Sequence, residues 1–217
     1  MSFIINPYNF ASAGSVVLLS ENFEGPGATG WTSTIPWNDQ FSTAPAPLDG
    51  DYSGNINGTT TAIHAYKNFT PSPNVYCRFD FNISRNTAGG ALATIRDASN
   101  NVLATFGTTI TASIARASPA GGSTINATTA PTFNSTIYGW FEYEKGTGSN
   151  SICRVGFRED SQNRPNWPSS GASGRLAVSI NGTSTATPAR IMFGTNTAAT
   201  NYNMIFDNIE VRNTPFP

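Results

Sequence analysis

Two short segments near opposite ends of the chain constrain its fold more than any other feature. Residues 21–25 read Glu-Asn-Phe-Glu-Gly and are followed by Gly30-Trp31, whereas residues 205–211 read Ile-Phe-Asp-Asn-Ile-Glu-Val. In both segments apolar residues alternate with polar ones, and acidic residues stand at fixed places among them. Alternation of this kind is the pattern of a half-buried β-strand. We therefore expect one closed β-sandwich whose first and last strands meet.

Alternation with a period of two recurs along the chain, and no segment has a convincing helical period. The expected strands are residues 15–20, 62–69, 74–84, 90–97, 102–106, 109–115, 138–145, 152–158, 175–180, 189–194 and 202–212. Residues 116–135 are rich in Thr, Gly and Pro, and we expect a long loop there. Many short strands separated by turn residues are typical of a sandwich or barrel. The sequence predicts an all-β protein with a single jelly-roll β-sandwich.

The composition is consistent with one sandwich domain at residues 15–217, preceded by an extended N-terminal arm at residues 1–14. A chain of 217 residues is within the range of single all-β domains. Charged residues make up 12% of the chain, about half the ~25% of an average soluble domain, and the net charge is −1. Without a basic run to neutralise phosphates, nucleic acid is not an expected partner. Without an apolar stretch of ~20 residues, a membrane span is not expected either.

The first residues also bear on localisation. Residues 1–7 lack the basic start of a secretory signal, and their apolar run is interrupted by Asn6 and Pro7. A virion protein, which is made in the cytoplasm and released by lysis, is consistent with this start. The alternative is an extracellular protein whose signal has been removed.

Two cysteines stand in similar alternating segments. Cys77 shares its face with Phe79, and Cys153 shares its face with Val155. We expect both to be buried free thiols that pack as small apolar side chains. A disulfide between them is the alternative, because sequence alone does not set the Cα separation that a disulfide requires.

The two terminal segments resemble a known pattern. Phe23-Glu24-Gly25 followed by Gly30-Trp31 resembles the opening of jelly-roll carbohydrate-binding modules attached to xylanases and β-glucanases, and residues 206–211 resemble their closing strand. Concanavalin A-like laminin-G domains have a similar last strand. The resemblance implies a structural calcium ion held by Glu24 and Asp207, with backbone carbonyls completing its shell of six to eight oxygens. The alternative is that both carboxylates cap turns or bond neighbouring amides.

Residues 140–144 read Trp-Phe-Glu-Tyr-Glu and are candidates for a ligand-binding face. Alternation places Trp140, Glu142 and Glu144 together on one side of a strand, with the carboxylates about 7 Å apart. That spacing is within the range of glycosidase acid/base pairs. Laminarinase-type hydrolases, however, have the motif Glu-x-Asp-x-x-Glu, whereas Thr147 stands three residues after Glu144 here. We expect a groove-lining or solvated pair and no catalysis.

Trp37 and Trp167 both lie in turn-rich segments. Aromatic rings exposed in loops stack on sugar rings, while neighbouring Asp, Asn and Arg side chains bond the hydroxyls. We therefore take Trp37, Trp140, Glu142, Glu144 and Trp167 as candidate carbohydrate-binding residues. The alternative for the two loop tryptophans is that each folds back and closes an end of the sandwich.

The function expected from the sequence is that of a non-enzymatic structural or adhesive protein of a bacteriophage particle, such as a capsid decoration, head fibre or tail accessory protein. The arm would contact other virion proteins, the face would contact cell-surface glycans, and the protein would be a homo-oligomer or part of a larger assembly. The alternative is a carbohydrate-binding module or lectin of a polysaccharide-using bacterium. A glycan hydrolase or lyase is the least favoured hypothesis.

Overall fold

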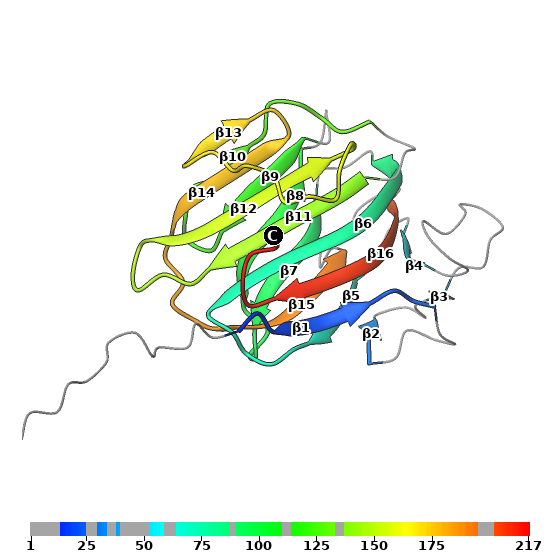
Figure 1. Ribbon diagram of the computed structural model, residues 1–217, viewed down its shortest axis with the longest axis horizontal. Coiled ribbons are helices and arrows are strands. Elements are labelled where there is room, and N and C mark those ends of the chain that lie inside the picture. The colour runs from blue at the N-terminus through cyan, green and yellow to red at the C-terminus, as the bar shows by residue number, and fades with distance from the viewer. Residues whose placement is uncertain are drawn as a thin grey trace, which may run out of the picture.

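The computed structural model contains only β-strands within its described residues, and they pair antiparallel in two sheets that face each other (Figure 1). The described residues are 14–24, 30–33, 38–39, 53–58, 64–86, 90–109, 114–132, 137–194 and 202–217. The expected all-β sandwich is confirmed. Of the expected arm only Gly14 is described, and Trp37 lies outside these ranges. No membrane-spanning helix is found within the described part of the chain.

The larger sheet has nine strands within the described residues. Eight follow one another across it in this order: β13 (Gly171–Ser173), β14 (Leu176–Gly182), β12 (Ser151–Arg158), β11 (Ile137–Glu144), β6 (Asn74–Asn86), β16 (Tyr202–Arg212), β4 (Gly54–Gly58) and β3 (Asn38–Asp39). The ninth, β1 (Val17–Glu21), pairs with β16. We call this sheet the large sheet, and the side that faces away from the second sheet its outer face.

The second sheet has seven strands within the described residues. Their order is β10 (Ile125–Asn126), β9 (Ala115–Pro119), β8 (Val102–Thr108), β7 (Ala91–Asp97), β15 (Pro188–Gly194), β5 (His64–Asn68) and β2 (Thr32–Ser33). Between the sheets lies one apolar core, and its centre is a group of phenylalanines. Phe79 of β6 contacts Phe106, Phe193 and Phe206 with ring centroids 5.1–6.0 Å apart. The apolar residues that alternate with polar ones along these strands therefore face the space between the sheets, as the sequence pattern predicts.

The two terminal segments meet, as the sequence predicts. β1 pairs antiparallel with the second half of β16, and Ser20 lies opposite Glu210. A β-bulge interrupts β16 after Asp207, where Asn208 has a positive φ of 47°. Asn tolerates this left-handed backbone better than most residues. Because of the bulge, Phe206 and Ile209 both face the core although they are three residues apart.

Residues 116–135 are not one long loop, and that expectation is wrong. The segment contains most of β9 and all of β10. Ala115 and Ala117 of β9 are fully buried and alternate with less buried residues. The buried side chains of β9 are small, and the strand ends at Pro119, so the sequence lacks the large apolar residues by which the other strands are recognised. Of the strand expected at 109–115, residues 110–113 lie outside the described ranges.

The cysteines are buried and free, as expected. Both face the core from strands that flank β11, with Cys77 opposite Phe141 on one side and Cys153 opposite Tyr143 on the other. Two strand spacings separate them by roughly 9–10 Å, beyond the ~7 Å limit for bridged Cα atoms. Burial raises the pKa of the Cys77 thiol above its ordinary value and that of Cys153 to about 12.

Candidate functional site

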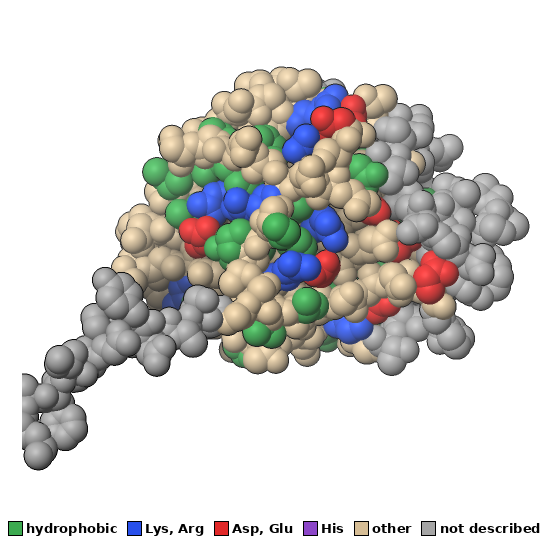
Figure 2. Space-filling view, in the orientation of Figure 1, with side chains coloured by type: hydrophobic (Ala, Val, Ile, Leu, Met, Phe, Trp, Pro, Cys, Tyr) green, Lys and Arg blue, Asp and Glu red, His purple; other side chains and the backbone are tan. Residues whose placement is uncertain are grey.

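The outer face of the large sheet carries most of the candidate residues. Phe141 and Tyr143 of β11 point into the core, and Trp140 and Glu142 point the opposite way, as alternation predicts. Figure 2 shows cationic, anionic and apolar side chains intermixed on this side of the molecule. The face is therefore polar, and neither positive nor negative charge predominates on it.

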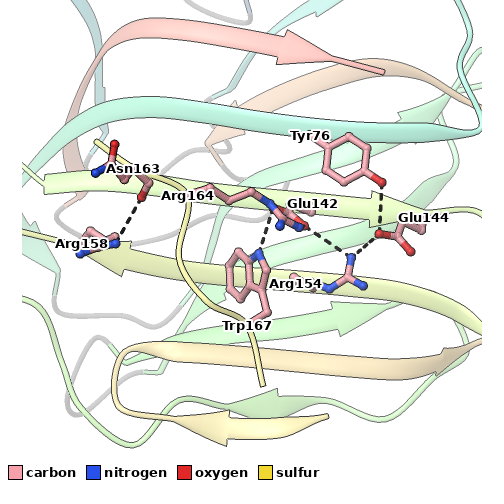
Figure 3. A network of polar contacts seen from close by, with 8 residues as sticks. All are labelled: Tyr76, Glu142, Glu144, Arg154, Arg158, Asn163, Arg164 and Trp167. Carbon is pink, nitrogen blue, oxygen red and sulfur yellow. Dashed lines mark hydrogen bonds and ion pairs between the residues drawn. The ribbon is translucent and has the colours of Figure 1, made fainter. Parts of the chain in front are cut away.

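Glu142 is the centre of a network of polar contacts on this face (Figure 3). Its side chain is 0% exposed. Arg164 donates from Nε to Oε1 at 2.6 Å and from Nη2 to Oε2 at 2.8 Å. Trp167 donates from Nε1 to Oε1 at 2.9 Å, and Arg154 donates from Nη1 to Oε2 at 3.4 Å. A buried carboxylate is stable only when paired in this way, and its hydrogen bonds raise the pKa of Arg164.

Glu144 extends the network toward β6. Its Oε1 accepts a hydrogen bond from Tyr76 Oη at 3.1 Å and another from Arg154 Nη1. Burial, reinforced by the charge of Glu144, raises the pKa of the Tyr76 phenol far above its ordinary value. Arg154 bridges Glu142 and Glu144, so both carboxylates are held as acceptors. This is the arrangement of an ion-pair network that fixes neighbouring segments.

The segment fixed by this network is the loop of residues 159–170, which connects β12 to β13. It borders three hollows. Asp160 lines one of about 420 Å³, Gln162 lines one of about 300 Å³, and Trp167 lines one of about 350 Å³. A single loop thus forms part of the wall of each hollow, and Glu142 anchors it to the sheet.

The three hollows differ in chemistry. The 420 Å³ hollow combines apolar and polar side chains, including Phe157, Leu176, Arg158 and Asn166. The other two are mainly polar. Residues lining the 300 Å³ hollow include Glu21, Arg78, Asp80, Asn208 and Glu210. Those lining the 350 Å³ hollow include Arg154, Arg164, Asn166, Trp167 and Ser169.

Trp167 is half-buried and lies against β12. A Cβ atom added at Gly156 would stand 3.2 Å from Trp167 Cζ3 and 2.4 Å from Leu176 Cδ2. Gly156 therefore leaves the space that the indole occupies, and the bond from Nε1 to Glu142 fixes the orientation of the ring. The ring is neither fully buried nor free to turn.

Trp140 differs from the expectation of an exposed ring. It is 0% exposed and belongs to a small apolar cluster with Tyr76 and Phe216, against which Trp167 also packs. The Phe216 ring covers it edge-on, with centroids 5.4 Å apart and planes at 87°. The side of the sheet was predicted correctly, but a segment far along the chain covers the residue.

The expected calcium ligands lie in unequal surroundings. Asp207 is fully buried, and its two oxygens accept hydrogen bonds from Ser53 Oγ at 2.6 Å and from the Asn208 amide at 2.7 Å. Glu24 is exposed. Across the described ranges there is no group of three or more His, Cys, Asp or Glu side chains placed to hold a metal. An ion bound here would need carbonyl or water oxygens for most of its shell, so calcium stays a prediction.

Two residues central to this face were not singled out as site residues from the sequence. Arg164 forms the strongest contact of Glu142, and Phe216 covers Trp140. A signal for Arg164 was present, since it stands near Trp167 in a loop that follows a strand with outward-facing charges. No pattern in the sequence indicated that Phe216 would fold back onto the sheet.

Comparison with known proteins identifies the fold and no family. No family model matches the chain, and no curated protein matches it. Among solved structures, a sialidase matches with a TM-score of 0.59 and 14% identity over 90% of this chain, which spans only 18% of the sialidase chain. A cellulose-induced protein, Cip1, matches with a TM-score of 0.58 and 13% identity, covering 90% of this chain and 97% of that one.

A third matched structure is the CBM2 module of the evolved Dit protein of Lactobacillus casei BL23 phage J-1. Its TM-score is 0.54 with 9% identity, and the match covers 94% of this chain and 98% of that one. Polysaccharide lyases also occur among the matches, at 9–10% identity. At such low identity the likenesses show a shared β-sandwich fold, which binding modules and lyases both have.

Proposed function

We propose that this protein is a non-enzymatic glycan-binding component of a bacteriophage particle, with a structural or adhesive role, and that it binds glycan on the outer face of the large sheet. The observation that carries the proposal is the 159–170 loop. It presents the half-buried ring of Trp167 to the 350 Å³ hollow, borders the 420 Å³ hollow through Asp160 and Asn166, and is anchored by a fully buried carboxylate. A fixed aromatic ring beside convergent polar groups is suited to a ligand with both apolar and polar faces.

The polar groups around Trp167 match the hydroxyl and carboxylate groups of sugars. Arg154 and Arg164 line the same hollow as the indole, and Asn166 lines both this hollow and the larger one. Arginine donates to paired oxygens in a plane, and an amide both donates and accepts. A pyranose ring in the 350 Å³ hollow thus meets an aromatic surface and several donors.

The state of the two carboxylates supports a binding role over catalysis. A glycosidase needs one carboxyl group that is protonated and free to donate to the leaving oxygen. Glu142 accepts from two arginines and a tryptophan, and Glu144 accepts from Arg154 and Tyr76. Both are engaged as acceptors, and Glu142 positions the loop.

The glycan-binding part of the proposal is tested by applying the wild-type protein and a Trp167→Ala variant to a glycan array. We expect one or a few related glycans to bind the wild type and to lose at least tenfold in affinity with Trp167→Ala, the scale of ~1.4 kcal/mol. Trp37→Ala tests the other loop tryptophan in the same way. Val102→Ser, at a 37% exposed position on β8 of the opposite sheet, is the matched control. An array without hits contradicts glycan binding by the wild-type protein.

The virion part of the proposal is supported by the fold likeness to a phage Dit module and by the arm expected at residues 1–14. The arm would join this protein to other virion proteins, in a homo-oligomer or a larger assembly. We expect deletion of residues 1–14 to abolish incorporation into particles while the sandwich still folds. Normal incorporation of the truncated protein contradicts this role. Glycan binding without particle association favours the alternative, a carbohydrate-binding module or lectin of a polysaccharide-using bacterium.

A further inference from the structure

Residues 213–217 follow β16 and turn back over the outer face of the large sheet, where Figure 1 marks the chain end in front of β6 and β11. Phe216 is 6% exposed although it lies in a segment outside the strands. Its ring stands on Trp140 and lies near two guanidinium groups, with Arg78 Cζ at 5.1 Å and Arg212 Cζ at 4.7 Å from its centroid. We call residues 213–217 the strap.

Beyond Asn213, the main contact of the strap with the sheet is the Phe216 ring. Asn213 is tied to β1 by two hydrogen bonds, from its amide to the Val16 carbonyl and from the Val16 amide to its Oδ1. Beyond Asn213, no hydrogen bond among the described residues involves residues 214–217. Withdrawal of residues 214–217 therefore breaks no hydrogen bond among the described residues and leaves both sheets paired.

One hydrogen-bond donor in the cluster beneath the strap has no acceptor among the described residues. Trp140 Nε1 is buried and has no hydrogen-bond partner among the described residues. A buried tryptophan normally finds a partner for this group, and leaving a donor unpaired disfavours the closed arrangement. With Phe216 over Trp140, the Nε1 group of Trp140 thus lacks an acceptor among the described residues, and the oxygen of a hydroxyl group can provide one.

Phe216 also has neighbours in the walls of two hollows. Arg78, which contacts the Phe216 ring, lines the 300 Å³ hollow. Trp167, which packs against the same cluster, lines the 350 Å³ hollow. The Phe216 ring therefore contacts, directly or through its cluster, one wall residue of each of two polar hollows that border the same loop.

We propose that the strap is displaceable and that Phe216 occupies a binding subsite for one pyranose ring. When the strap leaves, Trp140 and Tyr76 form an aromatic floor, and Trp140 Nε1 donates to a sugar hydroxyl. Arg78 and Arg212, released from Phe216, supply further donors, and the two hollows become one groove. This inference rests on the glycan-binding function proposed above, and it adds a subsite that the strap closes.

The test uses Phe216→Ala and a variant that lacks residues 214–217, so that one remains informative if the other folds poorly. Phe216→Tyr, which keeps a ring in place, is the matched control. Each protein is ¹⁵N-labelled, and its tryptophan indole signals are recorded by NMR, with Trp140 assigned through Trp140→Phe. The probes are methyl glycosides of glucose, galactose, mannose, xylose and glucuronic acid, together with any glycan that binds the wild type on an array.

We expect the Trp140 indole signal to shift with at least one probe in Phe216→Ala and in the truncated chain, and not in Phe216→Tyr. If the strap is closed in at least about nine-tenths of the wild-type molecules, its removal raises the apparent affinity for the probe about tenfold or more. We call Phe216→Ala and the truncated chain the open variants. The subsite is overturned if both fold, their Trp140 signals do not shift with any probe, and their affinities on the array equal those of the wild type.

The outcomes also separate this inference from the proposed function. If the wild type binds glycans on the array and both open variants bind them equally well, the proposed function stands and the subsite beneath the strap is rejected. A silent array together with a Trp140 shift in the open variants supports the subsite and rejects binding by the closed protein. Silence in both experiments rejects both proposals.

Discussion

Arg164 and Glu142 stand 22 residues apart in the sequence, and their side chains form a two-point ion pair on the outer face of the large sheet, with contacts of 2.6 and 2.8 Å. The pair joins a strand, β11, to the loop of residues 159–170. Because that loop borders three hollows, Glu142, which lines none of the three, anchors a wall that they share. Glu142 is thus a positioning residue.

Removing the charge of Glu142 should destabilise the protein strongly. We expect Glu142→Gln to lower the free energy of unfolding by about 1.5–3 kcal/mol, because it removes the charge that the half-buried Arg164 and Arg154 share. Urea denaturation measures this. Glu144→Gln is the control: its side chain is 28% exposed, and we expect a loss of about 1 kcal/mol or less. Equal losses in the two variants would mean that Glu142 does not anchor the loop.

The position of Trp167 depends on the missing side chain at Gly156. We expect Gly156→Ala to displace the indole and Leu176, with a cost of about 1–3 kcal/mol, and to weaken glycan binding together with a change in tryptophan fluorescence. Gly148→Ala is the matched control, since a Cβ atom there has no neighbour within 4 Å. An unchanged emission spectrum in Gly156→Ala would show that the ring does not depend on this space.

The sequence predicts the strands of the large sheet well, because their alternation is strong. The expected strand at residues 202–212 coincides with β16, and that at 74–84 falls within β6. β9 was missed because its buried positions are the small residues Ala115, Ala117 and Pro119, so the strand lacks the large apolar side chains that mark the other strands. Local pattern suffices where apolar and polar residues contrast sharply.

The candidate site is less predictable for a physical reason. Alternation correctly places Trp140 and Glu142 on one side of β11. It cannot reveal that Phe216 covers the first or that Arg164 neutralises the second, because both contacts come from irregular segments. The roles of these residues are decided by distant chain segments, whose paths no periodic pattern encodes.

The calcium prediction for Glu24 and Asp207 is tested by thermal melting. If the ion binds the folded protein only, we expect the melting temperature to fall in a chelator and to rise again with excess Ca²⁺. Asp207→Asn should destabilise even without calcium, because Asp207 accepts bonds from Ser53 and the Asn208 amide. Glu24→Gln, at an exposed position, should remove only the rise in melting temperature that depends on calcium. A melting curve that ignores both chelator and Ca²⁺ contradicts the site.

Stability should fall at alkaline pH because of the buried thiols. The pKa of Cys77 and that of Cys153 are raised by burial above the ordinary value of 9.0, the latter to about 12. A group whose pKa is raised by folding contributes its full stability below its unfolded pKa and loses it as the pH rises toward the folded pKa. The unfolded chain therefore releases two thiol protons above pH 9 that the folded chain retains.

The expected loss is up to about 1.4 kcal/mol per pH unit for each thiol, beginning near pH 9. Burial also raises the pKa of Tyr76 and Tyr143, so the loss should steepen above pH 10, the ordinary value of a phenol. Urea denaturation between pH 8 and 10.5 measures the slope. In a variant with Cys77→Ala and Cys153→Ala the first part of the slope should vanish and the part above pH 10 should remain. A wild-type free energy of unfolding that stays constant from pH 8 to 10 would contradict retention of the thiol protons in the folded core.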